Sequence, residues 1–156
     1  MIRKICLVLT TICLLMVIGG LLLNRDREEM RWKQNGSIEL NHEVYTNMNE
    51  WTAYNILKDG DWESTSIDPI LISPLFAAAD GKKTYLHIKM VTDSDRIQVF
   101  WRGRNEDFAE ERSKVFDNHS AIELMLEGDV EQIRIDPAEQ PGVSFEIHQV
   151  DVKRYK

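Results

Sequence analysis

The chain has 156 residues, 43% of them hydrophobic and 29% charged, and a formal net charge of −7 at pH 7. Beyond residue 33 there are 13 basic and 23 acidic residues, an excess of ten negative charges. A surface of that sign repels phosphate backbones, so we expect no nucleic-acid partner. Both cysteines lie before residue 24, so the remainder can form no internal disulfide.

The N-terminal segment has the pattern of a membrane anchor. A short basic tail over 1–4 precedes residues 5–23, which carry no charged side chain. As an α-helix at about 1.5 Å per residue this run reaches roughly 28 Å, close to the hydrocarbon thickness of a bilayer. We expect a single transmembrane helix over 5–23, in contact with lipid. Beyond it we expect a polar stalk over 24–35 and one domain over 36–156.

A cleaved signal peptide is the alternative, because the segment also begins with Arg3 and Lys4. Its apolar run exceeds the usual length of about 7–15 residues, however, and lacks a small-residue cleavage pattern. Two arguments about the side of the membrane on which the domain lies point in opposite directions. Counting Lys and Arg on both flanks slightly favours a cytoplasmic domain, whereas a short basic tail is typical of signal anchors that export the domain C-terminal to them. We expect a single-pass membrane protein whose domain is extracytoplasmic.

Period-two alternation predicts half-buried strands along the domain. It is seen over 85–91, 95–102, 122–126, 133–135 and 143–152, the last with a change of register before Val150. Turn-forming residues such as Asp-Gly and Pro-Gly separate these stretches. Short strands and turns, with no long amphipathic helix, predict an all-β antiparallel sandwich or barrel. The one stretch that fits a short helical turn, or else a polar loop, is 105–112.

The order of these motifs resembles a known module. RIQVFW over 96–101 is followed by Val115-Phe116, then by VEQIRIDP over 130–137 and GVSFEI over 142–147. This order resembles a galactose-binding-like jelly-roll module of bacterial glycosyltransferases, glycoside hydrolases and surface-glycan assembly proteins, similar to carbohydrate-binding modules. The resemblance covers about 84–152. It implies a β-sandwich of jelly-roll type with a non-catalytic role.

The motif over 130–137 also has a direct physical interpretation. Ile133 and Ile135 should face the core while Arg134 faces the other way. Asp136-Pro137 should end the strand, because proline cannot donate to the ladder. We therefore expect Arg134 and Asp136 to have a structural role, as an ion pair or in a turn.

Four residues are the candidate carbohydrate-binding set: Trp62, Trp101, Arg102 and Asn105. A flat aromatic face can stack on the apolar face of a pyranose ring, and the loop after Trp101 places Arg102 and Asn105 where they can bind hydroxyls. Trp101 shares parity with Ile97 and Val99, so core packing is its alternative. Trp62 lies in a polar turn and is expected to be more exposed. Trp51 fits either a core position or an exposed one, and Trp32 fits a position at the membrane interface.

The candidate metal ligands are Asp59, Asp61 and Glu63. Carboxylates in loops of jelly-roll modules can hold a structural Ca²⁺, which takes six to eight oxygen ligands, and these three supply part of such a shell. The Asp-x-Asp spacing also occurs in glycosyltransferases, but no nucleotide-binding βαβ unit accompanies it. We expect no required cofactor, with structural Ca²⁺ as the alternative.

These patterns predict a membrane-anchored, non-catalytic module that binds a saccharide or surface polysaccharide, or that assists bacterial cell-surface glycan assembly. The first alternative is a protein–protein adaptor that docks a membrane glycosyltransferase or transporter without binding sugar. A degenerate glycosidase is the second, and it would need two carboxylates roughly 5–10 Å apart in a cleft. An exposed tryptophan in a concave face would favour sugar binding, whereas a contiguous apolar patch would favour the adaptor.

Overall fold

The computed structural model describes residues 36–59, 62–117 and 121–156. The chain divides into two units, Met1–Ile38 and Glu39–Lys156, and every strand described here belongs to the second. The expected tail, anchor and stalk, over 1–4, 5–23 and 24–35, lie outside the described residues. Within the described ranges, no helix is both long and apolar enough to cross a bilayer.

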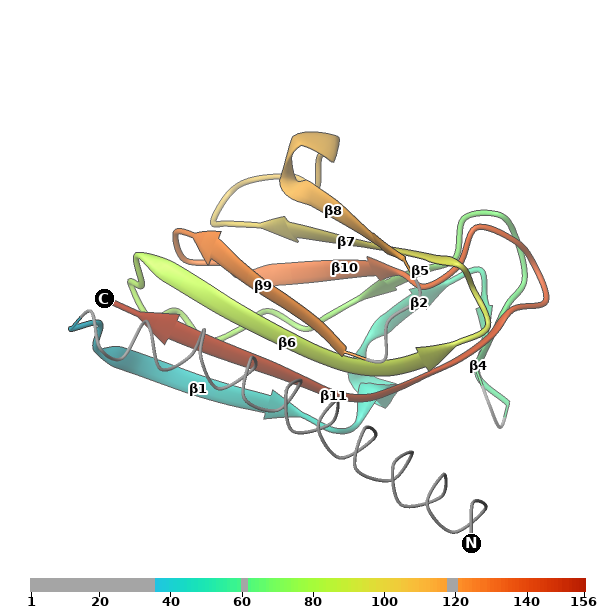
Figure 1. The fold of residues 1–156 in the computed structure, drawn as a ribbon, viewed down its shortest axis with the longest axis horizontal. Helices are drawn as coiled ribbons and strands as arrows, with labels where there is room; N and C mark the ends of the chain where they lie inside the picture. Colours follow the sequence, from blue (N-terminus) through green and yellow to red (C-terminus); the bar gives the residue numbers. More distant parts are fainter. Residues whose placement is uncertain (1–35, 60–61, 118–120) are drawn as a thin grey trace, which may run out of the picture. The chain divides into compact units, whose positions relative to one another are not determined.

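Two antiparallel sheets pack as a β-sandwich, as Figure 1 shows. In sheet A the order is β3 (Ile56–Leu57), β4 (Trp62–Ser64), β11 (Ser144–Tyr155), β6 (Lys83–Thr92) and β9 (Ala121–Glu127), and β1 (Glu39–Tyr45) also pairs with β11. In sheet B the order is β2 (Thr52–Tyr54), β5 (Ile70–Ile72), β10 (Gln132–Asp136), β7 (Arg96–Arg102) and β8 (Ser113–Asp117).

The chain crosses repeatedly between the two sheets, as in a jelly roll. β1 lies in sheet A, β2 in sheet B, β3 and β4 in sheet A and β5 in sheet B; β6 to β11 continue the exchange. Consecutive strands are therefore often not partners, and side chains distant in sequence meet. The long β11 pairs with β4 near its start and with β1 along its second half.

The alternating stretches form the expected strands. Leu86, Ile88 and Met90 of β6 are fully buried, and so are Ile133 and Ile135 of β10. The predicted register change is a bulge in β11, where the pairing with β6 shifts between Ile147 and Gln149. The bulge keeps Val150 and Val152 facing the core even though the alternation from Phe145 and Ile147 is broken. The all-β sandwich is thus confirmed for the described residues.

Two short 3₁₀ turns occur in the part of the chain that the structure describes. Glu110–Arg112 falls within the stretch that fitted a helical turn. Met48–Glu50 is capped by the Asn47 side chain, which accepts a hydrogen bond from the Asn49 N–H at 3.0 Å. It leads directly into Trp51, which is only 2% exposed. Trp51 is therefore a core residue.

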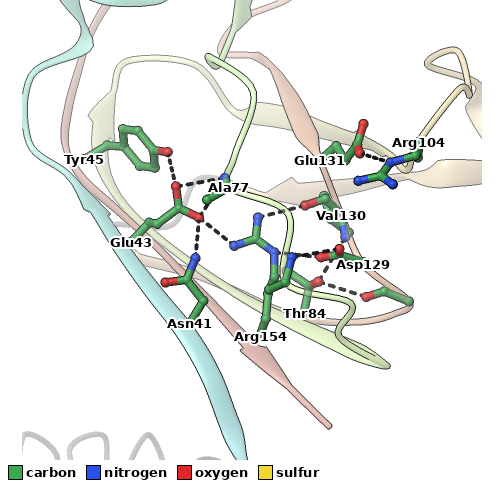
Figure 2. A network of polar contacts seen from close by, with 12 residues as sticks. Asn41, Glu43, Tyr45, Ala77, Thr84, Arg104, Asp129, Val130, Glu131 and Arg154 are labelled. Carbon is green, nitrogen blue, oxygen red and sulfur yellow. Dashed lines mark hydrogen bonds and ion pairs between the residues drawn. The ribbon is translucent and has the colours of Figure 1, made fainter.

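A buried arginine ties the C-terminal strand to its surroundings (Figure 2). Arg154 of β11 has no exposed surface. Its Nη1 donates to Glu43 Oε1 of β1 at 2.6 Å, and its Nε lies 2.8 Å from Asp129 Oδ1. Its Nη2 donates to the Val130 carbonyl at 3.1 Å. Because a buried charge is costly unless it is paired, these contacts are a condition for β11 to occupy its place in the sheet.

Glu43 is itself held by several donors. Besides Arg154 it accepts hydrogen bonds from the Tyr45 hydroxyl at 2.7 Å, from Asn41 Nδ2 at 3.1 Å and from the Ala77 N–H at 3.2 Å. Burial alone raises the pKa of Glu43, but the hydrogen bonds from Tyr45, Arg154 and Ala77 outweigh it and lower that pKa below 4.5. The charged carboxylate is the form that the fold stabilises.

Glu43→Gln tests this network through pH. A carboxyl whose pKa is lowered on folding adds stability above its unfolded value near 4.5, and that stability is lost as pH falls through the folded pKa. At pH 7 the variant should lose about 1.5–3 kcal/mol of unfolding free energy, as for a hydrogen bond to a charged group. Urea denaturation at pH 7 and pH 3 should show the two proteins converging in acid. Glu127→Gln is the matched control, since that side chain is 82% exposed. A constant difference at both pH values would contradict the assignment.

Candidate functional site

The two candidate tryptophans lie at opposite ends of the sandwich. Trp62 pairs with Phe145, which in turn pairs with Thr92 at the end of β6. β7 begins at Arg96, just after the turn that follows β6, and Trp101 lies near its far end opposite Ile133. Five residues of strand span about 17 Å. Trp62 and Trp101 therefore do not form one site.

Trp62 is less open than its polar neighbours suggested. It begins β4 rather than lying in a turn, and its half-buried ring packs edge-on against Phe145 with centroids 6.0 Å apart. Lys58 Nζ lies 4.5 Å from the ring centroid and donates to the Trp51 carbonyl at 3.0 Å. Burial lowers the pKa of Lys58. The Lys58 ammonium group therefore lies over one face of the Trp62 ring.

Near Trp62, the Asp59 and Glu63 side chains are exposed, and Asp61 lies outside the described residues. In the described part of the chain no three His, Cys, Asp or Glu side chains are grouped closely enough to hold a metal ion. Two carboxylates from separate segments, Glu43 and Asp129, do converge on a buried position, but the Arg154 guanidinium fills it. A divalent cation does not fit there beside it, because the two positive charges would repel each other.

Trp101, Arg102 and Asn105 are close in sequence, but the structure does not bring their side chains together, because Trp101 faces the core and Arg102 faces outward from sheet B. Trp101 packs against the core. Arg102 Nε donates to Gln132 Oε1 at 2.8 Å, Nη1 donates to the Glu106 carbonyl at 3.0 Å, and the guanidinium lies 5.7 Å from the Phe108 ring. Asn105 is exposed with φ of 59°, as in a tight turn. At this end of the sandwich the Arg102 guanidinium is therefore bonded within the protein.

The outward side of sheet B carries a different set of side chains, polar and apolar, which we call the sheet-B face. It comprises the side chains that alternate with the core positions of five strands: Thr52, Tyr54, Ile70, Ile72, Gln132, Arg134, Asp136, Arg96, Gln98, Phe100, Arg102, Ser113, Val115 and Asp117. The sequence pointed to Arg134 and Asp136 only as structural residues. Tyr54, Arg96 and Gln98 were not predicted, because their neighbours come from other strands.

Arg134 organises the middle of this face. Its Nε and Nη2 donate to the two oxygens of Asp136 at 2.7 and 2.6 Å, and Nη2 also lies 3.3 Å from Asp68 Oδ1. The predicted ion pair is thus confirmed. The guanidinium lies 4.7 Å from the centre of the Phe100 ring. This contact explains why an aromatic residue interrupts the polar side of β7: Phe100 is only 4% exposed beneath Arg134.

Asp136 combines burial with charge pairing. Burial raises the pKa of Asp136, Arg134 works against this, and the negative charges of Asp68 and Glu110 reinforce it. Hydrogen bonding to Asp136 raises the pKa of Arg134. The pair is therefore fixed in orientation, at the cost of partial desolvation.

A pocket of about 160 Å³ opens beside this pair. Its lining contains three carboxylates and one guanidinium, together with an amide and several apolar groups: Ile67, Asp68, Arg96, Ile97, Gln98, Val115, Asp136, Ala138 and Glu139. Gln98 Nε2 donates to Glu110 Oε2 at 3.0 Å and to Ser113 Oγ at 2.9 Å, and Arg96 Nη1 lies 2.7 Å from Glu139 Oε1. Hydrogen bonds to Glu110 and Ser113 thus engage the amide of Gln98, and a largely exposed ion pair joins Arg96 to Glu139 within the lining.

Tyr54 stands at the edge of the same face. It pairs with Ile70 in β5, and its neighbour Ala53 faces the core, so the Tyr54 ring points away from the core and is 54% exposed. Asp136 lies one strand beyond β5, opposite Gln98. With strands about 4.8 Å apart, Tyr54 is roughly 10 Å from Asp136 across the sheet. The face thus offers an aromatic surface at one edge and fixed polar groups further in.

Comparison with known proteins identifies the fold. No protein-family model matches the chain, and no curated protein matches it. The C-terminal CBM6 of LamC, a marine laminarinase from Zobellia galactanivorans, superposes with a TM-score of 0.50 at 7% identity, covering 73% of this chain and 100% of that one.

Two further modules give similar values. The low-affinity xylan-binding module CBM86 of Roseburia intestinalis has a TM-score of 0.49 at 11% identity, covering 74% and 96% of the two chains. CBM35 from Paenibacillus barcinonensis has 0.48 at 9% identity, covering 70% and 97%. At such identities the likeness concerns the fold alone. The resemblance to a jelly-roll module of the carbohydrate-binding type is confirmed at that level.

Trp101→Ala should act on stability. Removing a ring that packs against the core leaves a cavity, so we expect a loss of about 3 kcal/mol in unfolding free energy, measured by urea denaturation. Asn105→Gly is the control within the same loop, because glycine accepts the positive φ; its change should stay within about 0.5 kcal/mol. An unchanged midpoint for Trp101→Ala would mean that the ring is not a packing element.

Proposed function

We propose that the chain is a membrane-anchored, non-catalytic module that binds carbohydrate on the sheet-B face. The observation that carries this proposal is the combination on one face of an exposed aromatic ring, Tyr54, with a pocket whose polar side chains are fixed by hydrogen bonds. The fold likeness to carbohydrate-binding modules supports it only in general terms.

Sugar binding requires both hydrogen-bonding groups and an aromatic surface. A pyranose presents hydroxyls that both donate and accept hydrogen bonds, along with a patch of C–H groups that packs on an aromatic ring. Asp136 and Gln98 offer acceptors, Arg96 offers donors, and Tyr54 offers the ring. Because hydrogen bonds already hold Asp136 and Gln98, these two side chains lose little entropy on binding.

The size and charge of the pocket limit the kinds of sugar that it can bind. A volume of about 160 Å³ is below the roughly 300–1,000 Å³ of sites for drug-sized molecules, so it suits one sugar unit of a longer chain. The carboxylates of Asp68, Asp136 and Glu139 outnumber the guanidinium of Arg96 in the lining. A neutral sugar is therefore favoured over a uronic acid, whose carboxylate would be repelled.

Tethering completes the proposed role. An anchor over 5–23 would hold the domain on the outer side of a bacterial membrane, near surface polysaccharide. The anchor raises the local concentration of the domain, so a weak site can still act on a polymer with many repeats. The proposed task is to retain or present surface glycan, or to assist its assembly, without chemistry on it.

The adaptor function is the second candidate, and one observation favours it. Ile67 is 77% exposed and Val115 is 40% exposed, and both line the pocket on the sheet-B face. Apolar groups at the rim suit a protein partner such as a membrane glycosyltransferase or transporter. The two functions thus compete for one surface, and a sugar-binding measurement separates them.

The test is a glycan array probed with the full-length chain in a detergent that contains no sugar headgroup. We expect binding to neutral polysaccharides and none to uronic-acid polymers. Tyr54→Ala should weaken binding at least tenfold, equivalent to about 1.4 kcal/mol, because the stacking surface is lost. Leu57→Ala is the matched control, since Leu57 is 53% exposed but belongs to β3 of sheet A.

Binding that survives Tyr54→Ala unchanged would place the sugar elsewhere. If the folded wild-type chain bound neither neutral nor charged glycans, carbohydrate binding would be rejected and the adaptor function would remain. Thermal unfolding of each variant shows whether the fold is intact before its binding is compared.

A further inference from the structure

The pocket on the sheet-B face carries an excess of negative charge. Three carboxylates line it, those of Asp68, Asp136 and Glu139, against one guanidinium, that of Arg96. Arg96 Nη1 lies 2.7 Å from Glu139 Oε1, so the charge of this guanidinium is already paired inside the lining. The carboxylates of Asp68 and Asp136 therefore set the sign of the potential that a ligand meets.

Arg134 does not cancel this excess. It donates to both oxygens of Asp136 and also lies 3.3 Å from Asp68 Oδ1, so one cation is shared between two carboxylates. Its guanidinium is not part of the pocket lining. Glu110 adds a further negative charge nearby, and its Oε2 accepts a hydrogen bond from Gln98 of the lining. Four carboxylates thus face two guanidinium groups.

The pKa of Asp136 agrees with this excess of negative charge. Burial, the largest cause, raises this pKa, and the negative charges of Asp68 and Glu110 raise it further. The hydrogen bonds and the charge of Arg134 lower it but do not outweigh the other causes. A carboxyl that ionises less readily than usual, even beside a paired guanidinium, is stabilised by a further positive charge placed next to it.

The lining of the pocket also accepts hydrogen bonds more readily than it donates them. An ionised carboxylate has about four acceptor positions, and three such groups line the pocket, whereas a single guanidinium supplies five N–H donors. In the described part of the chain, the Asp136 carboxylate accepts two hydrogen bonds and that of Asp68 accepts one. The Gln98 amide already donates to Glu110 and Ser113. A protonated amine fits such a lining, because it has three donors and no acceptor.

We propose that the unit entering this pocket is an amino sugar with a free, protonated amine. The inference rests on the carbohydrate-binding function proposed above and names the sugar class for the same site. The ammonium group donates charge-assisted hydrogen bonds to Asp136 and Asp68. The C–H groups of the sugar ring contact the exposed side chains of Ile67 and Val115 in the lining. N-acetylation of the amine removes its charge and two of its donors, so the advantage over a neutral sugar is lost.

Three β-1,4-linked tetrasaccharides test the proposal: the tetramers of glucosamine, of N-acetylglucosamine and of glucose. They share a backbone and differ in the group at C2. Binding to the full-length chain in a zwitterionic detergent is measured by isothermal titration at pH 6, where the free amines are charged. The glucosamine tetramer should bind about fivefold more tightly than the other two, near the upper end of what a partly exposed ion pair contributes. Added NaCl should reduce this preference, because salt screens the charges.

A pair of double variants locates the preference. Asp68→Asn combined with Glu139→Gln removes two negative charges from the lining, at side chains that are 62% and 57% exposed. The readout is the ratio of the affinities for the glucosamine and glucose tetramers, which should fall to about one because the charge attraction is lost. Glu127→Gln combined with Glu146→Gln is the matched control. It removes the same charge from exposed positions of sheet A and should keep the wild-type ratio.

The possible failures are distinguishable. Equal affinity of the wild-type chain for all three tetramers would overturn the amino-sugar assignment and leave carbohydrate binding standing. If the folded wild-type chain bound none of them and no other glycan, the proposed function would fall and this inference with it. A preference that the lining variant keeps, or that the sheet-A variant also loses, would show that the amine responds to the overall charge of the domain. Undiminished binding of the glucosamine tetramer by Tyr54→Ala would place the amine outside the sheet-B face.

Discussion

The pairing of one fully buried charge, Arg154, constrains much of sheet A. A guanidinium with no exposed surface is tolerated only where acceptors meet it, and here they come from residues 111 and 24 positions away in sequence. β1 must therefore lie beside β11, and the segment around Asp129 must close over the end of the sheet. Hydrophobic burial supplies the driving force for the sandwich. The charged network selects the arrangement of its strands, because a misplaced partner would leave the charge unpaired.

The sheet-B face repeats this chemistry in a more open form. Arg134 is again a cation between carboxylates, and it again lies over an aromatic ring, but part of its side chain remains in contact with solvent. Partial exposure reduces the contribution of such a pair to stability, and Asp136 of the pair lines the pocket on this face. The same residue types thus brace the fold in sheet A and shape a candidate binding surface in sheet B.

The two polar networks belong to different sheets of the sandwich. Arg154 and its partners involve β1, β11 and the segments before β6 and β10, whereas Tyr54, Asp136 and Gln98 lie on the outer side of the opposite sheet. Substitutions on the sheet-B face can therefore be made without breaking the buried network.

The sequence by itself determined the strands with clear alternation and the core positions within them, because a period of two assigns each side chain to a face whatever its partner strand. It also identified the Ile133–Asp136 motif, the Arg134–Asp136 pair and the break in β11, since all depend on nearby residues. Only the tertiary structure decided which strands are neighbours. For that reason, only the tertiary structure showed that Trp62 and Trp101 lie apart and that Tyr54 is exposed near the pocket containing Asp136. It also showed that Arg154 is buried although the C-terminal stretch around it is rich in charged residues. The burial of these residues and their distances from one another depend on contacts between segments that are far apart in sequence. The local sequence pattern does not indicate such contacts.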